Sequence, residues 1–387
     1  MSKLPDVGTT IFTVMSRRAR ELGALNLGQG FPDYDIDPRL TELVAAAMTA
    51  GRNQYAPMEG VLELREQIAN KLHASYGVSV NPESEVTVTL GATEAIYCAV
   101  QALVGAGDEA IVFDPSYDSY DPAVRLAGAK CVHIPLQPPE FRYDWDRVAA
   151  SINERTRLII INTPLNPACT VATKEDLDAL AALIANRNIY VLSDEVYEHV
   201  MYDGREHNSV LRHPQLRERS VAVFSFGKTL HATGVRIGYS IAPAELTREL
   251  RKVHQFNTFS IATAFQYAIA EYLVEKPDAW RALPDFFQAK RDRVRAALEG
   301  TPFVAPPAQG TYFQLIDYSA ITNAADVTFA ERLLTEAGVA TIPLSPFYKQ
   351  PPHLTMLRLC VAKRDRTLDD AVARLQAFAR GLQEDAG

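Results

Sequence analysis

One lysine and one arginine stand eight residues apart, among small and hydroxyl-bearing residues, directly after a predicted buried strand. The apolar run V-A-V-F at 221–224 predicts the strand, and S-F-G-K-T-L-H-A-T-G-V-R-I-G follows it at 225–238. Burial at a strand end disfavours the charged form of Lys228 and lowers its pKa, which makes it a better nucleophile. Such an amine can form a Schiff base with an aldehyde.

The groups around this lysine suit a phosphate. Ser225 and Thr229 carry hydroxyls, and Arg236 carries a planar guanidinium. A small molecule with both an aldehyde and a phosphate is pyridoxal phosphate, so we predict a site for this cofactor. The segment also resembles the S-x-[SAG]-K-x(7)-[KR] signature around the cofactor lysine of class I and II aminotransferases, although a surface loop with this pattern remains the alternative.

A second candidate phosphate contact lies earlier in the chain. The predicted strand V-T-V-T-L at 86–90 runs into G-A-T-E-A at 91–95, which opens a helix that continues to about Val104. A glycine at such a turn lets free backbone N–H groups and the positive end of the helix dipole face an anion. We therefore predict that Gly91, Ala92 and Thr93 contact the phosphate.

Two more polar turns follow predicted strands. The strand at 188–193 ends in Asp194 and Glu195, which could be helix caps. We favour an ion pair between Asp194 and a protonated pyridine nitrogen, because a buried carboxylate beside a cation stays ionised. The strand at 157–162 leads to T-P-L-N-P-A at 163–168, where two prolines restrict the loop around Asn166.

Gly91, Asn166, Asp194 and Lys228 all follow the carboxyl ends of predicted strands. Ligands of open α/β sheets bind along that edge, so the four turns indicate one crevice. No G-x-G-x-x-G or Walker motif indicates a nucleotide site. The alternation of strands and helices predicts an α/β fold with a mostly parallel mixed sheet and helices on both faces. Strands at 310–316 and 355–361, with helices at about 326–337 and 366–382, predict a smaller α+β domain.

The resemblance to class I and II aminotransferases of fold type I spans nearly the whole chain, from T-I-F at 10–12 to R-L-C-V-A-K at 358–363. It is strongest to the bacterial methionine aminotransferases of the kynurenine aminotransferase-like group. T-P-L-N-P-A resembles the family's N-[TP]-P-x-N-P-[TS]-G motif, and L-N-L-G-Q-G-F-P-D at 25–33 resembles its substrate-side loop. Departures at Leu165, Gly227 and Val235 affect the shape of the pocket.

The resemblance implies a role for each matching residue. Lys228, Asp194 and Tyr197 would be catalytic. At the cofactor, Asn166 and Tyr197 would bond the phenolic oxygen, Tyr117 would stack on the ring, and Tyr55 would reach the phosphate in the neighbouring subunit. At the substrate, Arg358 would clamp the carboxylate, and Gly30 and Phe12 would lie beside it. For Arg358, an edge-strand arginine in a salt bridge is the alternative. The resemblance also implies a homodimer with shared sites.

The family pattern predicts three parts: an N-terminal segment at 1–43 that joins the small domain, a large cofactor-binding domain at 44–284, and a small domain at 285–387. The expected reaction is ping-pong transamination between an amino acid and a 2-oxo acid. Dicarboxylate-specific relatives place a second arginine in the stretch that matches 254–266, which here has no Arg or Lys. We therefore expect methionine or an aromatic or other neutral amino acid as donor. A kynurenine or glutamine type of aminotransferase, a cysteine-conjugate β-lyase and a non-catalytic sensor are the alternatives.

The composition limits the partners. The chain has 387 residues, 47% of them hydrophobic, and a net charge of −8, which argues against nucleic acid and anionic membranes. We find neither a signal peptide nor an apolar run of about 18 residues, and expect a cytoplasmic protein. Four scattered cysteines are expected to be buried thiols, and eight scattered histidines show no metal-ligand spacing, so no metal is expected.

Overall fold

A seven-stranded mixed sheet forms the centre of the computed structural model, which describes residues 2–384. Its strand order is β2-β8-β7-β6-β5-β3-β4, and every strand except β8 points the same way. The strands are β2 (Val86–Thr89), β3 (Glu109–Asp114), β4 (Lys130–Pro135), β5 (Thr156–Asn162), β6 (Tyr190–Asp194), β7 (Ser220–Ser225) and β8 (Gly238–Ile241).

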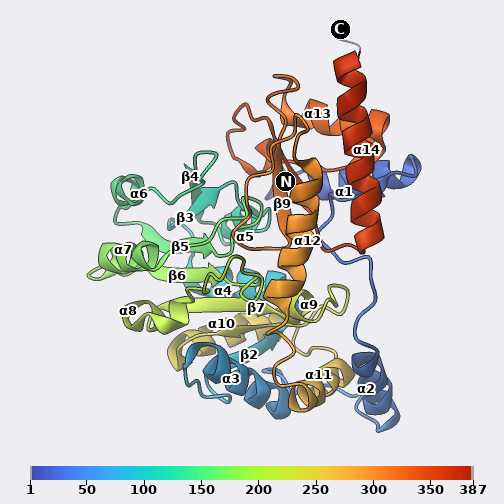
Figure 1. Ribbon diagram of the computed structural model, residues 1–387. Helices are drawn as coiled ribbons and strands as arrows, with labels where there is room; N and C mark the ends of the chain where they lie inside the picture. The colour runs from blue at the N-terminus through green and yellow to red at the C-terminus, as the bar shows by residue number, and fades with distance from the viewer. Residues whose placement is uncertain (1, 385–387) are drawn as a thin grey trace.

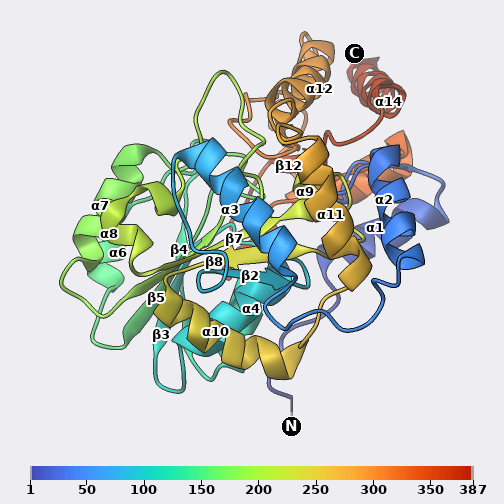
Figure 2. The same ribbon diagram turned by 90° about the horizontal axis from the view of Figure 1, so that it is seen from below.

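Helices cover both faces of this sheet (Figures 1 and 2). In β5, Leu158 and Ile160 join the apolar cluster on one face, whereas Ile159 and Ile161 join the cluster on the other. Burial on both faces explains why the strands read as continuous apolar runs. One face packs against α4 (Gly91–Leu103), α5 (Tyr120–Leu126) and α10 (Ala244–Asn257). The other packs against α3 (Leu62–Tyr76), α6 (Trp145–Ser151), α7 (Lys174–Ile184) and α8 (Pro214–Arg217), and α11 (Thr263–Glu275) lies on α3.

A smaller antiparallel sheet has the order β11-β12-β9. It consists of β9 (Phe313–Asp317), β11 (Ile342–Pro343) and β12 (Met356–Cys360). Around it lie α12 (Leu283–Leu298), α13 (Asp326–Arg332), a π-helical turn (Leu333–Ala337) and α14 (Asp365–Glu384), with α12 and α14 side by side (Figure 1). Because β12 is the central strand, the reading of Arg358 as an edge-strand arginine is wrong.

The N-terminal segment packs with this smaller part. It contains α1 (Ile11–Glu21), β1 (Leu25–Asn26) and α2 (Pro38–Thr49), and β1 pairs in parallel with β10 (Val339–Ala340). Figure 1 shows α1 beside the C-terminal elements, although it lies at the other end of the colour scale. The loop at 27–33 is thereby held against β12, where Cys360 donates its N–H to the carbonyl of Leu27 at 2.7 Å.

The expected long helices are present with ends shifted by a few residues. The helix expected at about 366–382 is α14, and the one expected at 326–337 ends in the π-helical turn. Cys98, Cys169 and Cys360 are buried thiols, as expected, but Cys131 is only half-buried because its strand, β4, is at the edge of the sheet. Among residues 2–384, no helix combines the length and the apolar character needed to cross a bilayer.

Candidate active site

A cavity lies at the carboxyl edge of the large sheet, where the sequence predicts one. Elements β2, β3, β5, β6 and β7 each send a residue or the turn after them to it. Its lining comprises Ala92, Thr93, Ile96, Tyr117, Asn162, Asn166, Asp194, Val196, Tyr197, Ser225, Lys228 and Arg236. Most of the predicted cofactor contacts are therefore brought together, although they come from separate parts of the chain.

Lys228 lies in α9 (Phe226–Thr229), the single helical turn that follows β7. Its Nζ atom is 2.6 Å from the hydroxyl oxygen of Tyr312 and 3.4 Å from the carbonyl oxygen of Gly30. Burial lowers the pKa of Lys228 to about 8, so part of the lysine is a free amine near neutral pH. Tyr312 is a site residue that the sequence reading missed, because 310–316 was assigned only to a strand.

Asp194 ends β6 and is 3% exposed. The hydroxyl of Tyr120 donates to its Oδ2 at 2.6 Å, and the backbone N–H of Val196 donates to its Oδ1 at 3.3 Å. Burial outweighs these bonds and raises the pKa of Asp194 to about 6. A cation beside this carboxylate would restore its ordinary ionisation.

The segment after Asp194 is anchored from behind the cavity. Glu195 accepts hydrogen bonds from the Ser193 hydroxyl at 2.8 Å and from Nε2 of His207 at 2.8 Å. Glu198 forms an ion pair with Lys71 at 2.6 Å, and both side chains are buried. Neither of these buried acids lines the cavity, whereas Asp194, Val196 and Tyr197 do.

Arg358 lies near the cavity with a guanidinium surrounded by aromatic rings. Its Cζ atom is 3.8 Å from the ring centre of Phe313, 5.0 Å from that of Phe12 and 5.9 Å from that of Phe347. Nη1 donates to the Asn166 side chain, and Nη2 donates to the Gly28 carbonyl at 3.0 Å. Nε is buried without a partner among the described residues. The guanidinium is thus partly unsatisfied and can accept an anion.

The turn after β2 brings Arg236 close to the helix start. Gly91 has φ +70°, and a Cβ there would lie 2.5 Å from Nη2 of Arg236, so only glycine fits without displacing the arginine. Nη2 of Arg236 is also 3.5 Å from the Thr93 hydroxyl. Gly227 is less crowded, because a Cβ there would lie 3.2 Å from Cα of Thr233. Ser225 is the hydroxyl-bearing residue of this segment that lines the cavity.

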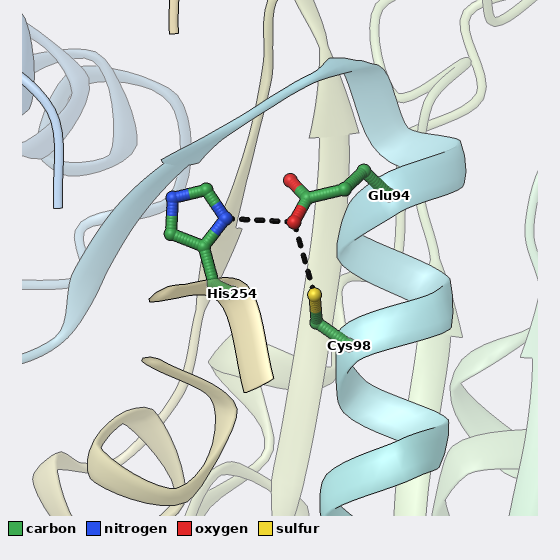
Figure 3. A group of neighbouring side chains, drawn as sticks. All are labelled: Glu94, Cys98 and His254. Carbon is green, nitrogen blue, oxygen red and sulfur yellow. Dashed lines mark hydrogen bonds and ion pairs between the residues drawn. The ribbon is translucent and has the colours of Figure 1, made fainter. Parts of the chain in front are cut away.

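A buried group of three side chains supports this turn and was missed by the sequence reading (Figure 3). Oε1 of Glu94 accepts from Nδ1 of His254 at 2.7 Å and from the Cys98 thiol at 3.0 Å, while Oε2 accepts the N–H of Leu90 at 3.0 Å. Nε2 of His254 is 2.8 Å from the Met58 carbonyl. Burial opposes ionisation of Glu94, but the bonds from His254 and Cys98 bring its pKa below the ordinary value.

A second group of possible ligand atoms comprises Asp121, Cys131 and His133. In the first group His254 and Cys98 already bond to Glu94, and in the second His133 already bonds to Asp121 and Asp114. Spacing along the chain could not reveal either group, because their members come from different elements.

Five predicted residues lie outside the cavity lining, namely Gly91, Arg358, Gly30, Phe12 and Tyr55. Gly30 accepts the Tyr312 hydroxyl at 2.6 Å, and the ring of Phe12 lies beside Arg358, so both are on the side of the smaller sheet. Tyr55 is 85% exposed and packs edge-on against Phe259, with ring centres 5.6 Å apart. It does not line the cavity of its own chain.

Comparison with known proteins identifies the same family that the sequence motifs resemble. The family model described as aminotransferase class I and II matches residues 23–375. The chain is 52% identical to a methionine aminotransferase of Escherichia coli over 97% of both chains. Among solved structures, an Escherichia coli protein reported to have methionine aminotransferase function superposes with a TM-score of 0.96, at 52% identity over 97% of this chain and 99% of that one. The N-succinyldiaminopimelate aminotransferase of Mycobacterium tuberculosis superposes with a TM-score of 0.94, at 38% identity over 98% of this chain and 100% of that one.

Proposed function

The chain belongs to the class I and II aminotransferases, and on that premise we propose that it prefers methionine as amino donor. As a member of this family it is a pyridoxal phosphate-dependent enzyme that moves an amino group from an amino acid to a 2-oxo acid. The proposal concerns the donor and the residues that carry out the reaction.

The chemistry of the cavity fits the cofactor. Lys228 offers an amine of lowered pKa to the aldehyde, and Asp194 offers a buried carboxylate that needs a cation, as a protonated pyridine nitrogen would supply. Arg236 and Ser225 offer positive charge and a hydroxyl to the phosphate. The remaining assigned contacts are Gly91, Ala92, Thr93, Tyr117, Asn166 and Tyr197 in the same chain, and Tyr55 in a partner chain.

The bound cofactor supplies an aldehyde that takes up the amino group and a ring that absorbs the electron pair released at the substrate α-carbon. Lys228 removes the α-proton, because its lowered pKa leaves a fraction of free amine near neutral pH. Asp194 keeps its negative charge beside the ring nitrogen. Arg358 holds the substrate carboxylate through two parallel N–H groups and so orients the α-carbon toward Lys228.

The aromatic surroundings of Arg358 carry the donor proposal. Phe12, Phe313 and Phe347 surround the guanidinium, so a donor clamped there meets apolar rings. A thioether makes favourable contacts with aromatic rings, whereas a second carboxylate finds no partner among them. The likeness to the Escherichia coli methionine aminotransferase supports the same choice.

Three further expectations remain part of the proposal. The exposed aromatic residues Tyr55, Phe256 and Phe259 support a homodimer that covers them. The separate sheets support a division into 1–43, 44–284 and 285–387. The four free cysteines support a reducing, cytoplasmic location.

Absorption spectroscopy between about 300 and 500 nm, with methionine added to the purified protein, tests the proposed function. We expect the visible band of the lysine-bound cofactor to be replaced by a band at shorter wavelength, and Lys228→Ala to lack the normal visible band. Aspartate and kynurenine, added at equal concentration, should react more slowly. A faster reaction with aspartate would refute the donor proposal, and pyruvate with ammonia from a cysteine conjugate would instead identify a β-lyase.

A further inference from the structure

The phenolic oxygen of Tyr312 lies between the amine of Lys228 and the carbonyl of Gly30. It is 2.6 Å from the Lys228 Nζ atom and 2.6 Å from the Gly30 oxygen. Tyr312 is fully buried, and its ring packs edge-on against Tyr197, with centres 5.0 Å apart. The hydroxyl therefore has two close polar neighbours and little freedom to move.

The direction of these hydrogen bonds follows from the donors available. A carbonyl oxygen can only accept, so the single phenolic proton of Tyr312 goes to Gly30. Burial raises the pKa of Tyr312 well above its ordinary value, which keeps that proton in place. The phenolic oxygen is then left with lone pairs alone, and it accepts an N–H from Lys228. The lone pair of the neutral amine is not used by this contact.

We propose that Tyr312 is a positioning residue for Lys228: its hydroxyl, oriented by Gly30, holds one N–H of the amine and leaves the nitrogen lone pair free for proton transfer. This inference rests on the proposed role of Lys228. It adds a link from the smaller sheet and the N-terminal loop to the reacting amine, since Tyr312 precedes β9 and Gly30 follows β1.

Tyr312→Phe removes the hydroxyl and retains the ring. The matched control is Tyr202→Phe, because Tyr202 is equally buried and donates to the carbonyl of Thr311, next to Tyr312 in the chain, without contacting Lys228. The first readout is the rate at which each cofactor-free, full-length variant captures pyridoxal phosphate as a function of pH, followed by absorbance.

Capture needs the neutral amine, so its rate rises as the pH passes the pKa of Lys228. A hydroxyl oxygen stabilises the ammonium more than the amine, and its loss should move the midpoint to lower pH by about one unit. The second readout is kcat with methionine, which should fall about 10- to 100-fold, with a larger isotope effect for α-deuterated methionine and a smaller change in KM. Tyr202→Phe should change neither the midpoint nor the isotope effect.

The inference is overturned if Tyr312→Phe matches Tyr202→Phe in both readouts. Should Tyr312→Phe fail to fold, Tyr312→Met decides, because it also removes the hydroxyl while a flexible thioether can fill the space of the ring. A midpoint and isotope effect unchanged in Tyr312→Met would then refute the proposal. Failure of the wild-type chain to capture any cofactor would instead refute the proposed function, and this inference with it.

Discussion

Nη1 of Arg358 donates to the side-chain oxygen of Asn166, which joins the smaller sheet to the cavity edge of the larger one. The Asn166 side-chain nitrogen has no partner among the described residues and is free to donate to a ligand in the cavity. The same contact occupies part of the Arg358 guanidinium. In the proposed function, a substrate carboxylate would complete an arrangement in which the Arg358 guanidinium and the Asn166 amide already face each other.

Arg358→Ala should raise the KM for methionine about 100-fold or more, because a buried carboxylate would lose a charged, two-pronged partner. Cofactor occupancy should be unchanged, since Arg358 does not line the cavity. Steady-state kinetics and the visible spectrum measure the two effects. Arg358→Lys keeps the charge without the planar fork, so its KM for methionine should lie between those of the wild-type chain and Arg358→Ala. Loss of the cofactor in Arg358→Ala would contradict the assignment.

Asp194→Asn should stabilise the cofactor-free chain at pH 8. Burial raises the pKa of Asp194 in the folded chain to about 6, from an ordinary value of 3.8, so ionisation is disfavoured by folding. The penalty is absent below pH 4, grows as the pH rises to 6, and is complete above it. It amounts to about 1–3 kcal/mol. The melting temperatures of both chains at pH 4.5 and pH 8 measure it.

The same Asp194→Asn variant should lose most transaminase activity, because the uncharged amide no longer holds a proton on the ring nitrogen. The wild-type chain should gain more stability from the cofactor at pH 8 than the variant does. Equal stabilisation of the two by the cofactor would mean that Asp194 does not face a cation.

Glu94→Gln should weaken cofactor binding, because Glu94 ties the turn at Leu90 to His254. Removing one partner of such a buried charged contact costs about 3 kcal/mol of stability. The pKa of Glu94 is lowered, so its contribution is present above the ordinary value of 4.5 and is lost as the pH falls through the lower folded value. Cofactor titration and melting curves measure the effects. Cys98→Ser is the milder control. Equal losses of cofactor affinity and stability in Glu94→Gln and Cys98→Ser would contradict the role of Glu94.

Lys71→Met should destabilise the chain by about 3–5 kcal/mol, because it leaves the buried Glu198 unpaired. Adding Glu198→Gln should recover part of the loss. Lys252→Met is the matched control: its ion pair with Glu249 is exposed and worth at most about 1 kcal/mol. Denaturant titration of the wild-type chain, Lys71→Met, the double variant and Lys252→Met measures the free energies of unfolding. A loss in Lys71→Met no larger than that in Lys252→Met would refute the prediction.

Most of the cavity-lining residues could be predicted because their turns follow predicted strands, whereas Ile96, Asn162 and Val196 were not predicted. Runs such as those before Asp194 and Lys228 indicate strands buried on both faces, and parallel strands place their carboxyl ends at one edge. The same logic located the turn at Gly91. The polar residues at this edge could thus be located from the predicted strands that precede them and from the rule that ligands bind at the carboxyl ends of parallel strands.

The supporting contacts could not be predicted in this way. Tyr312 reaches Lys228 from another sheet, and His254 reaches Glu94 from a helix far along the chain. Such pairs depend on how side chains meet after packing, and neither partner has a distinctive neighbour in sequence. Likewise, the alternation of β12 alone could not distinguish a central from an edge strand, so the surroundings of Arg358 required the structure.

The pairing of Leu25 with Val339 bears on how the chain assembles during translation. Leu25 is made early, whereas its partner strand is made only after the whole of the large sheet. Contacts between residues so distant in sequence form late, because a long loop must close first. The carbonyls of Gly28 and Gly30 therefore reach Arg358 and Tyr312 only near the end of synthesis. In the proposed assignment, the contacts that would clamp the substrate are therefore the last of the site that the growing chain can make.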